Sequence, residues 1–479
     1  MDFNNLSIPV ITAALREKQI SAVELTTLLF KRIKRLNALM KSFITLNEAH
    51  AMNAARAADD LLAKGAGGPL CGVPYAVKDN ICVEGIKTTC ASKMLENYLP
   101  PFSATAVLRL KASGAICLGK TNMDEFAMGS NGENSAFGAA RNPHNLSHVA
   151  GGSSGGSAAA VGANFVSFAL GSDTGGSVRR PASFCGVTGL KPTYGRVSRH
   201  GLVAFSSSLD QIGILAKSSK ESAFLLNIIA GKDDFDSTVS NRPLPDYSNP
   251  VSKPVIGIAD EFFGDFLSDE VKKSVLEAAD TFERMGYTLK KVSLPSLKYA
   301  LSAYYLISSA EAASNLARFD GVRFGESEKG ENYAECMENA RTAGFGDEVK
   351  RRILLGNYAL LHENSDDYYK KAMAARDKIR GEYTEIFENC DMLLTPSAPT
   401  TAPFAGAESA PCENYKSDIC TVSADLAGLP GVSIPCGIGA NKLPIGVSLS
   451  SAPFCEEKII PAAAHFEAET EKWRGINTL

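Results

Sequence analysis

The sequence predicts an α/β protein that forms one large domain, residues 1–479, in which helical segments are added to a sheet. Hydrophobic residues make up 45% of the chain and charged residues 21%, as in globular proteins, which excludes a disordered or fibrous chain. Short apolar runs alternate with Gly/Ser/Asn-rich turns across the segment 70–230. A strand–helix–strand pattern follows residue 254, and such units build parallel sheets.

The N-terminal segment, residues 1–65, is predicted to be helical. Ser21 and Glu24 have the spacing of a capping box, and apolar residues recur after them at helical spacing. Residues 51–63 are rich in alanine, which predicts a second helix. Gly65 and the pair Gly67-Gly68 are expected to end it.

The segment 70–230 carries two glycine-rich clusters, GGSSGGS at 151–157 and GSDTGGS at 171–177. The residues between them predict a helix followed by a strand. GVPYAVKD and GAICLGKT predict buried strands, and residues 107–111 the end of a helix. Glycines beside buried strands indicate that backbone amides approach another group closely.

The remaining chain begins with a connector rich in Pro, Ser and Asn, residues 234–254. In the segment 255–479, VIGIAD predicts a strand, SDEVKKSVLEAADTFERMG a helix capped by Ser268, and YTLKKVSLP a second strand. Residues 300–390 are predicted to be mostly helical. The last ninety residues return to short strands and turns, in AGLPGVSIPCG and PIGVSLSS.

Charge and cysteine usage limit the classes of function. The net charge is −4, so the chain is not expected to hold a nucleic acid by bulk charge. The 11 cysteines lack C-x-x-C spacing, which predicts small core residues in a reducing compartment rather than disulfides or a zinc site. No apolar run approaches about 18 residues and the N-terminus lacks a secretion signal, so a cytoplasmic protein is expected.

Residues 114–121, GAICLGKT, match the phosphate-binding pattern G-x-x-x-x-G-K-[ST]. In a phosphate-binding loop the four middle residues must form a loop whose amides wrap the phosphate. Here they are Ala, Ile, Cys and Leu, which favour a strand, and the preceding residues predict a helix end. We therefore reject a nucleotide site at this position.

Ser177 is a candidate nucleophile. Two glycines precede it, so the chain can turn sharply and direct backbone N–H groups at one point, as an oxyanion hole requires. The alternative is an ordinary Gly/Ser turn at the start of a helix. A serine hydroxyl also needs a base to accept its proton.

The sequence offers two kinds of base. None of the six histidines lies in a G-x-S-x-G context, so a Ser-His-Asp hydrolase lacks support. Lys78 ends an apolar strand, and burial would favour its neutral amine. Ser153 in the first glycine-rich cluster could pass a proton between Lys78 and Ser177. The alternatives are an exposed lysine at a strand end and a flexible Gly/Ser linker.

These residues carry a resemblance to the amidase signature family, through GVPYAVKDN, GGSSGGSAAAV and GSDTGGSVRRPASFCGVTGLKPTYGRVS. The resemblance implies one mixed central sheet with helices on both faces. It also implies that Ser177 is the nucleophile, that Ser153 follows a cis peptide after Gly152 and relays the proton, and that Lys78 is the base. The oxyanion hole would consist of the amides of Thr174, Gly175, Gly176 and Ser177.

A second set of motifs is similar to one branch of that family, the A subunits of bacterial aspartyl/glutamyl-tRNA amidotransferases. These motifs are KTNMDEFAMGS with ENSAFG, SAEAASNLARFDGVRFG, TAGFGDEVKRRILLGNYAL and SDICTVSADLAGLPGVSIP. The resemblance implies that the chain hydrolyses glutamine and passes ammonia through a tunnel to a B subunit. The B subunit uses ATP and Mg to activate Glu-tRNA(Gln), which it mainly holds, and a small C subunit ties the other two together. No cofactor or metal is expected in this chain.

The same resemblance implies that an arginine, either Arg351 or Arg352, and Asp418 hold the backbone carboxylate and amine of glutamine. The alternative for the two arginines is a solvated basic helix face. Asp173 and Arg180 are expected to pair and to hold the loop of the nucleophile. Two other functions stay open: a stand-alone amidase for small or aryl amides, and an inactive scaffold within the same complex. Whether Asp-tRNA(Asn) is also a substrate is open too.

Overall fold

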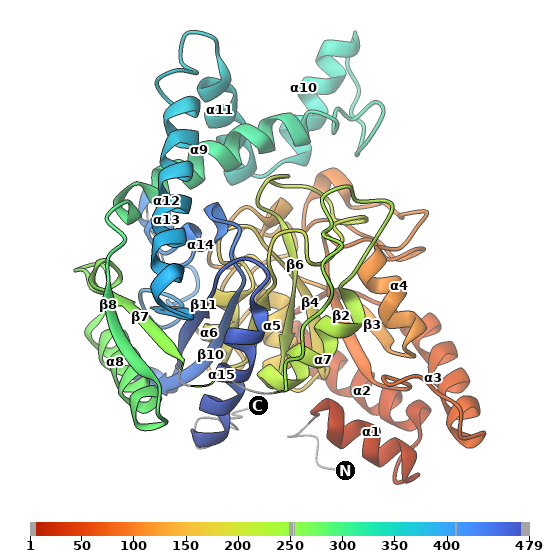
Figure 1. Ribbon diagram of the computed structural model, residues 1–479. Coiled ribbons are helices and arrows are strands. Elements are labelled where there is room, and N and C mark those ends of the chain that lie inside the picture. Colours follow the sequence, from red (N-terminus) through yellow and green to blue (C-terminus); the bar gives the residue numbers. More distant parts are fainter. Residues whose placement is uncertain (1–5, 249–251, 253, 408–409, 471–479) are drawn as a thin grey trace.

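The computed structural model describes residues 6–248, 252, 254–407 and 410–470. One sheet runs through this part of the chain (Figure 1), with the strand order β1-β3-β2-β4-β6-β5-β10-β11-β9-β7-β8. The strands are β1 (Phe43–Leu46), β2 (Pro74–Lys78), β3 (Ile116–Thr121), β4 (Phe168–Asp173), β5 (Thr188–Lys191), β6 (Gln211–Ala216), β7 (Val255–Ala259), β8 (Thr288–Val292), β9 (Met392–Pro396), β10 (Gly431–Ile438) and β11 (Pro444–Ser450).

The sheet is mixed, as predicted. Strands β3, β2 and β4 are parallel neighbours near one edge, and β9, β7 and β8 are parallel neighbours at the other. The strands between these groups are antiparallel, from β4 to β6 through to β11 and β9. The predicted strand–helix–strand unit is present as β7, a helix and β8.

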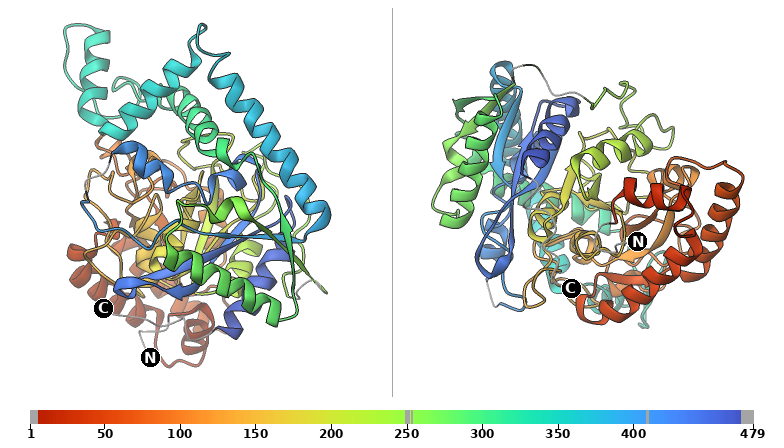
Figure 2. Two further views of the ribbon diagram at one scale, coloured as in Figure 1. Left: turned by 90° about the vertical axis from the view of Figure 1, so that its left-hand side faces the viewer. Right: turned by 90° about the horizontal axis from the view of Figure 1, so that it is seen from below.

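Helices surround the sheet and extend beyond it (Figures 1 and 2). They are α1 (Ile8–Arg16), α2 (Ala22–Met40), α3 (Glu48–Ala63), α4 (Thr105–Ala112), α5 (Gly155–Gly162), α6 (Arg179–Cys185), α7 (Ser219–Ile229), α8 (Asp269–Arg284), α9 (Leu297–Leu316), α10 (Tyr333–Gly344), α11 (Asp347–Leu360), α12 (Tyr369–Asn389), α13 (Pro411–Lys416), α14 (Val422–Leu426) and α15 (Glu456–Glu469).

Helices cover both faces of the sheet. Gly446 in β11 faces Ser183 of α6, because a Cβ there would lie 2.6 Å from the Ser183 hydroxyl oxygen. Gly437 in β10 faces Ser274 of α8, and its partner in the register is Ile445, the neighbour of Gly446. Since successive residues of a strand point to opposite faces, α6 and α8 lie on opposite sides.

Of the two helix caps predicted from the sequence, one forms its hydrogen bonds and the other does not. Ser21 and Glu24 form the predicted capping box, with the Glu24 N–H donating to Ser21 Oγ at 3.1 Å and the Ser21 N–H to Glu24 Oε2 at 2.9 Å. Ser268 does precede α8, but its hydroxyl makes no capping hydrogen bond. The connector 234–254 contains neither helix nor strand in its described part.

A row of strand glycines lets α6 lie unusually close to the sheet. Gly171 of β4 and Gly213 of β6 are paired in the register, and a Cβ on either would lie within 3.0 Å of Val178. A Cβ on Gly189 of β5 would lie 2.5 Å from Ala182 Cβ in α6. These glycines hold the start of α6, and the loop before it, against the carboxyl end of β4.

Helices α9 to α12 form an arm above the sheet (Figure 1). Helix α9 packs against α11 and α12. The α9–α11 contact is close at Gly356, where a Cβ would lie 2.0 Å from the Ser309 carbonyl oxygen. Gly356 therefore sets the distance between the two helices.

Two Gly→Ala substitutions in the arm test this packing. Gly356→Ala should lower the free energy of unfolding by about 1–3 kcal/mol, because backbone must move to admit the methyl group. Gly381→Ala, in α12 with open space around it, should raise it by ~0.5–1 kcal/mol through helix propensity. Urea denaturation of both variants measures the difference, and equal stabilities would contradict a close α9–α11 contact.

Candidate active site

Lys78 is buried at the end of β2, among hydroxyl groups. Its Nζ lies 2.7 Å from Ser153 Oγ, 2.9 Å from Ser172 Oγ and 3.1 Å from the Ser172 carbonyl oxygen. This follows from the sheet, because β2 and β4 are parallel neighbours and their carboxyl ends meet at one edge. Asn80 donates to the same Ser172 hydroxyl at 2.9 Å.

Burial lowers the pKa of Lys78 to about 7. The carboxylates of Asp124, Asp173 and Asp210 act in the opposite direction, but the loss of hydration is the larger effect. A substantial fraction of Lys78 is therefore a neutral amine near pH 7, as a general base requires.

The segment of Ser153 lies against the loop of Ser177. The Gly152–Ser153 peptide bond is cis, in agreement with the family resemblance. The Ser154 N–H donates to the Ser177 carbonyl oxygen at 3.0 Å, and the Asp124 N–H donates to the Ser153 carbonyl oxygen at 3.3 Å. Lys78, Ser153 and the Ser177 loop are thus brought together from three separate elements.

Asp173 organises the loop that carries Ser177, between β4 and α6. Its carboxylate accepts the N–H of Gly176 at 2.6 Å and the N–H of Val178 at 3.0 Å. Of the four amides expected in the oxyanion hole, that of Gly176 is therefore already engaged. The Thr174 hydroxyl donates to Asp210 Oδ1 at 2.6 Å, which fixes the loop from its other side.

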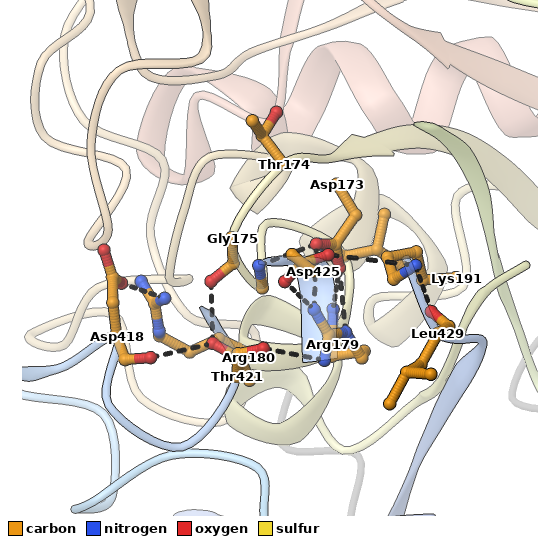
Figure 3. Close-up of polar contacts among 12 residues, drawn as sticks. Asp173, Thr174, Gly175, Arg179, Arg180, Lys191, Asp418, Thr421, Asp425 and Leu429 are labelled. Carbon is orange, nitrogen blue, oxygen red and sulfur yellow. Dashed lines mark hydrogen bonds and ion pairs between the residues drawn. The ribbon is translucent and has the colours of Figure 1, made fainter. Parts of the chain in front are cut away.

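The prediction that Asp173 and Arg180 form an ion pair is wrong. Asp173 pairs with Arg179, which donates from Nε and from Nη2, each at 3.1 Å, and Arg179 also bonds Asp425 (Figure 3). Burial alone would raise the pKa of Asp173, but the guanidinium of Arg179 holds it well below the usual range. Arg180 points elsewhere and pairs with Asp418 (Figure 3), because adjacent helical residues face different directions.

Asp418 and Arg352 belong to one buried cluster. Asp418 accepts hydrogen bonds from Arg180, from Ser130 Oγ at 2.9 Å and from the Tyr305 hydroxyl. The Tyr305 ring stacks on Tyr415 at 4.1 Å between centroids. The Arg352 guanidinium lies 4.4 Å from the centre of the Tyr305 ring and 4.8 Å from that of Tyr415.

Arg351 and Arg352 have different surroundings, although both bind Glu348. The Arg352 side chain is 3% exposed, and its Nε donates to Glu348 Oε1 at 2.7 Å. The Arg351 side chain is 43% exposed, so its guanidinium can reach a ligand. The two arginines line one cleft of about 220 Å³, together with Ser130, Asn131, Asn414 and Tyr415.

A second cavity of about 320 Å³ shares Glu133, Asn134, Asp347 and Glu348 with this cleft. Its wall includes Glu125, whose pKa burial raises to about 7 although Ser92 and the Gly346 N–H donate to it. The two cavities thus adjoin along the start of α11.

Sequence reasoning missed the aromatic side of the site. Tyr304 and Tyr305 lie in α9, where their apolar neighbours in sequence resemble any buried helix. Tyr304 lies over the nucleophile loop, since a Cβ on Gly175 would be 2.6 Å from the Tyr304 hydroxyl. Ser172 was part of the GSDTGGS cluster, and its place beside Lys78 followed from the parallel pairing of β2 and β4.

The remaining expectations concern ligands and location. Residues 116–121 form β3, and Lys120 is buried 3.2 Å from Asp79, so the apparent phosphate-binding pattern is part of a strand. The described cysteines are free thiols, most of them buried. In the described ranges, His, Cys, Asp and Glu form no group suited to a metal ion. The helices described are too short or too polar to cross a membrane.

Comparisons with known proteins show the family to which the chain belongs. A family model described as Amidase matches residues 24–460. The A subunit of the Halothermothrix orenii glutamyl-tRNA(Gln) amidotransferase is 48% identical over 98% of each chain, and that of Roseiflexus sp. is 49% identical over 96% of this chain and 95% of that one. The crystal structure of the A subunit from Thermotoga maritima superposes with a TM-score of 0.80 and 40% identity, over 98% of this chain and 96% of that one. The chain belongs to the amidase signature family.

Proposed function

We propose that this chain is the glutamine-hydrolysing A subunit of a tRNA-dependent amidotransferase. Its full-length similarity to A subunits of enzymes named for Glu-tRNA(Gln) supports the identity of the complex. The observation that carries the chemistry is the buried amine of Lys78, 2.7 Å from the Ser153 hydroxyl and beside the loop of Ser177.

The reaction begins with neutral Lys78. Ser177 Oγ attacks the side-chain amide carbon of glutamine, its proton passes to Ser153, and the Ser153 proton passes to Lys78. When the tetrahedral intermediate collapses, the C–N bond breaks and the proton returns to the leaving nitrogen, which departs as ammonia. Water then attacks the glutamyl ester on Ser177 in the same way and releases glutamate.

Backbone amides stabilise the oxyanion of this intermediate. The amides of Thr174, Gly175 and Ser177 are the available donors in the described structure, because that of Gly176 already donates to Asp173. Gly176 then contributes by shaping the loop, with a φ of +117°.

The cleft lined by Arg351 and Arg352 holds glutamine. Arg351 binds its carboxylate, since its guanidinium is half-exposed at the cleft and can form two parallel hydrogen bonds. Arg352 is enclosed by Tyr305, Tyr415 and Glu348 and positions this wall of the cleft. Asp418, which accepts a hydrogen bond from the cleft residue Ser130, binds the α-amino group.

The partners follow from the same proposal. A B subunit binds Glu-tRNA(Gln) and uses ATP and Mg to activate it, and a C subunit ties the other two together. The net charge of −4 is consistent with a chain that does not hold tRNA by bulk charge. The complex works in the cytoplasm, where translation takes place.

Trapping the acyl-enzyme tests the nucleophile. Quenching the full chain with its partner subunits during glutamine turnover should leave a glutamyl ester on the peptide that contains Ser177, visible by mass spectrometry. Ser177→Ala should lower glutaminase kcat by at least about 10³-fold, and the exposed Ser207→Ala should not. A chain that purifies alone and hydrolyses small or aryl amides faster than glutamine would favour a stand-alone amidase.

The pH dependence tests Lys78. Only the neutral amine accepts a proton, so kcat/KM should be constant above the pKa of Lys78 and should fall as pH drops through about 7. Well below pH 7 the fall should approach about tenfold per pH unit, as for one protonated base. A profile that stays flat between pH 8 and 5 would rule out Lys78 as the base.

The neighbouring arginines give contrasting outcomes. Arg351→Lys should raise the KM for glutamine about 10- to 100-fold, because lysine cannot make the two parallel hydrogen bonds. Arg352→Met should mainly lower stability, by about 3–5 kcal/mol, because it leaves Glu348 without its buried partner. Steady-state kinetics and thermal unfolding of both variants separate these roles, and a reversed pattern would exchange the assignments.

A further inference from the structure

We propose that Thr421 is a positioning residue of the oxyanion hole. Its hydroxyl fixes the peptide between Gly175 and Gly176, so that the amides on either side face the reacting carbonyl. This inference rests on the proposed function, in which Ser177 is the nucleophile.

The peptide between Gly175 and Gly176 is held at both polar ends. Thr421 Oγ1 donates to the Gly175 carbonyl oxygen at 2.7 Å (Figure 3), and the Gly176 N–H donates to Asp173 Oδ1 at 2.6 Å. A peptide unit is planar, so fixing both ends fixes its orientation. That orientation sets the directions of the neighbouring amides of Gly175 and Ser177.

These two hydrogen bonds, from Thr421 and to Asp173, are called the clamp below. The clamp is needed because the backbone torsions of two consecutive glycines are otherwise free to change. Glycine accepts backbone conformations on both sides of the φ map, and the loop contains Gly175 followed by Gly176. Side chains therefore have to supply the restraint. A Cβ on Gly176 would lie 2.2 Å from Thr421 Oγ1, and one on Gly175 would lie 2.5 Å from the Tyr304 ring, so both glycines are in close contact with neighbours.

Thr421 is itself held by hydrogen bonds to both of its backbone polar groups. It is 1% exposed, its N–H donates to the Asp418 carbonyl oxygen at 3.0 Å, and Arg179 Nη1 donates to its carbonyl oxygen at 3.4 Å. Arg179 also bonds Asp173, which holds the other end of the same peptide. The two halves of the clamp therefore share one guanidinium.

Removing the hydroxyl leaves the Gly175 carbonyl oxygen without its donor. A buried carbonyl without a partner is costly, so the peptide is expected to turn towards another donor and to carry the neighbouring amides with it. Such a change weakens binding of the tetrahedral intermediate more than binding of glutamine itself.

The test compares Thr421→Val, which keeps the shape and lacks the hydroxyl, with Thr421→Ser, which keeps the hydroxyl. Both are made in the full chain co-expressed with its partner subunits. T421V should lower glutaminase kcat about 10- to 100-fold with KM changed less than about twofold. T421S should retain kcat within about threefold, since the donor remains.

A boron analogue of glutamine, 2-amino-4-boronobutanoic acid, provides the second readout. Ser177 Oγ donates an electron pair to the vacant boron orbital, one O–B bond forms, and the serine proton passes to Lys78. This adduct is tetrahedral and occupies the oxyanion hole, whereas glutamate binds without forming it. T421V should weaken the boron analogue by the same factor as kcat and leave the affinity for glutamate unchanged.

Three outcomes would overturn the inference: unchanged kcat in T421V, unchanged affinity for the boron analogue, or an equal loss of affinity for analogue and glutamate with a lower melting temperature. If T421V shows no melting transition and so is not folded, Thr421→Ala is used in its place. A wild-type complex that hydrolyses simple amides but not glutamine would overturn the proposed function alone. T421V and T421S are then compared with that amide as substrate. T421V is expected to show the same loss of kcat, and T421S is expected to retain kcat.

Discussion

Burial of one lysine amine among hydroxyl groups is the constraint on which this structure depends. Lys78 Nζ contacts Ser153 and Ser172, and no carboxylate in the described residues forms an ion pair with it. Full exclusion from water without an ionic partner favours the neutral amine. The sheet supplies this environment, because the parallel pairing of β2 and β4 brings Lys78 to the end of the strand that leads into the nucleophile loop.

A buried charge network then gives the loop its shape. Asp173 accepts two backbone amides of the loop and binds the Arg179 side chain, and Asp425 binds the same Nη2 atom of Arg179. Lys191 adds a second cation, 3.8 Å from Asp425. Buried ion pairs contribute little net stability against apolar packing, so this network is better explained by the precise placement of a glycine-rich segment.

Local patterns were sufficient to predict many of the elements and to single out Lys78, Ser153 and Ser177 as candidates, which the structure places close to one another. The capping box at Ser21, the strand that ends at Lys78 and the glycine clusters are all properties of adjacent residues. Partners from distant segments were not predictable in this way. Asp173 pairs with Arg179 rather than Arg180 because the first turn of α6 directs consecutive side chains apart, and the Tyr305–Tyr415 stack depends on how α9 meets the segment after residue 410.

The order of these parts along the chain has a consequence for biosynthesis. Gly175 and the threonine that holds its carbonyl are separated by 246 residues. A partly translated polypeptide therefore contains Lys78, Ser153 and Ser177 long before it contains Thr421. The restraints from Asp173 and Asp210 are available early, whereas the hydrogen bond from Thr421 can form only when synthesis is nearly complete. A prematurely terminated product therefore lacks one of the restraints on this loop.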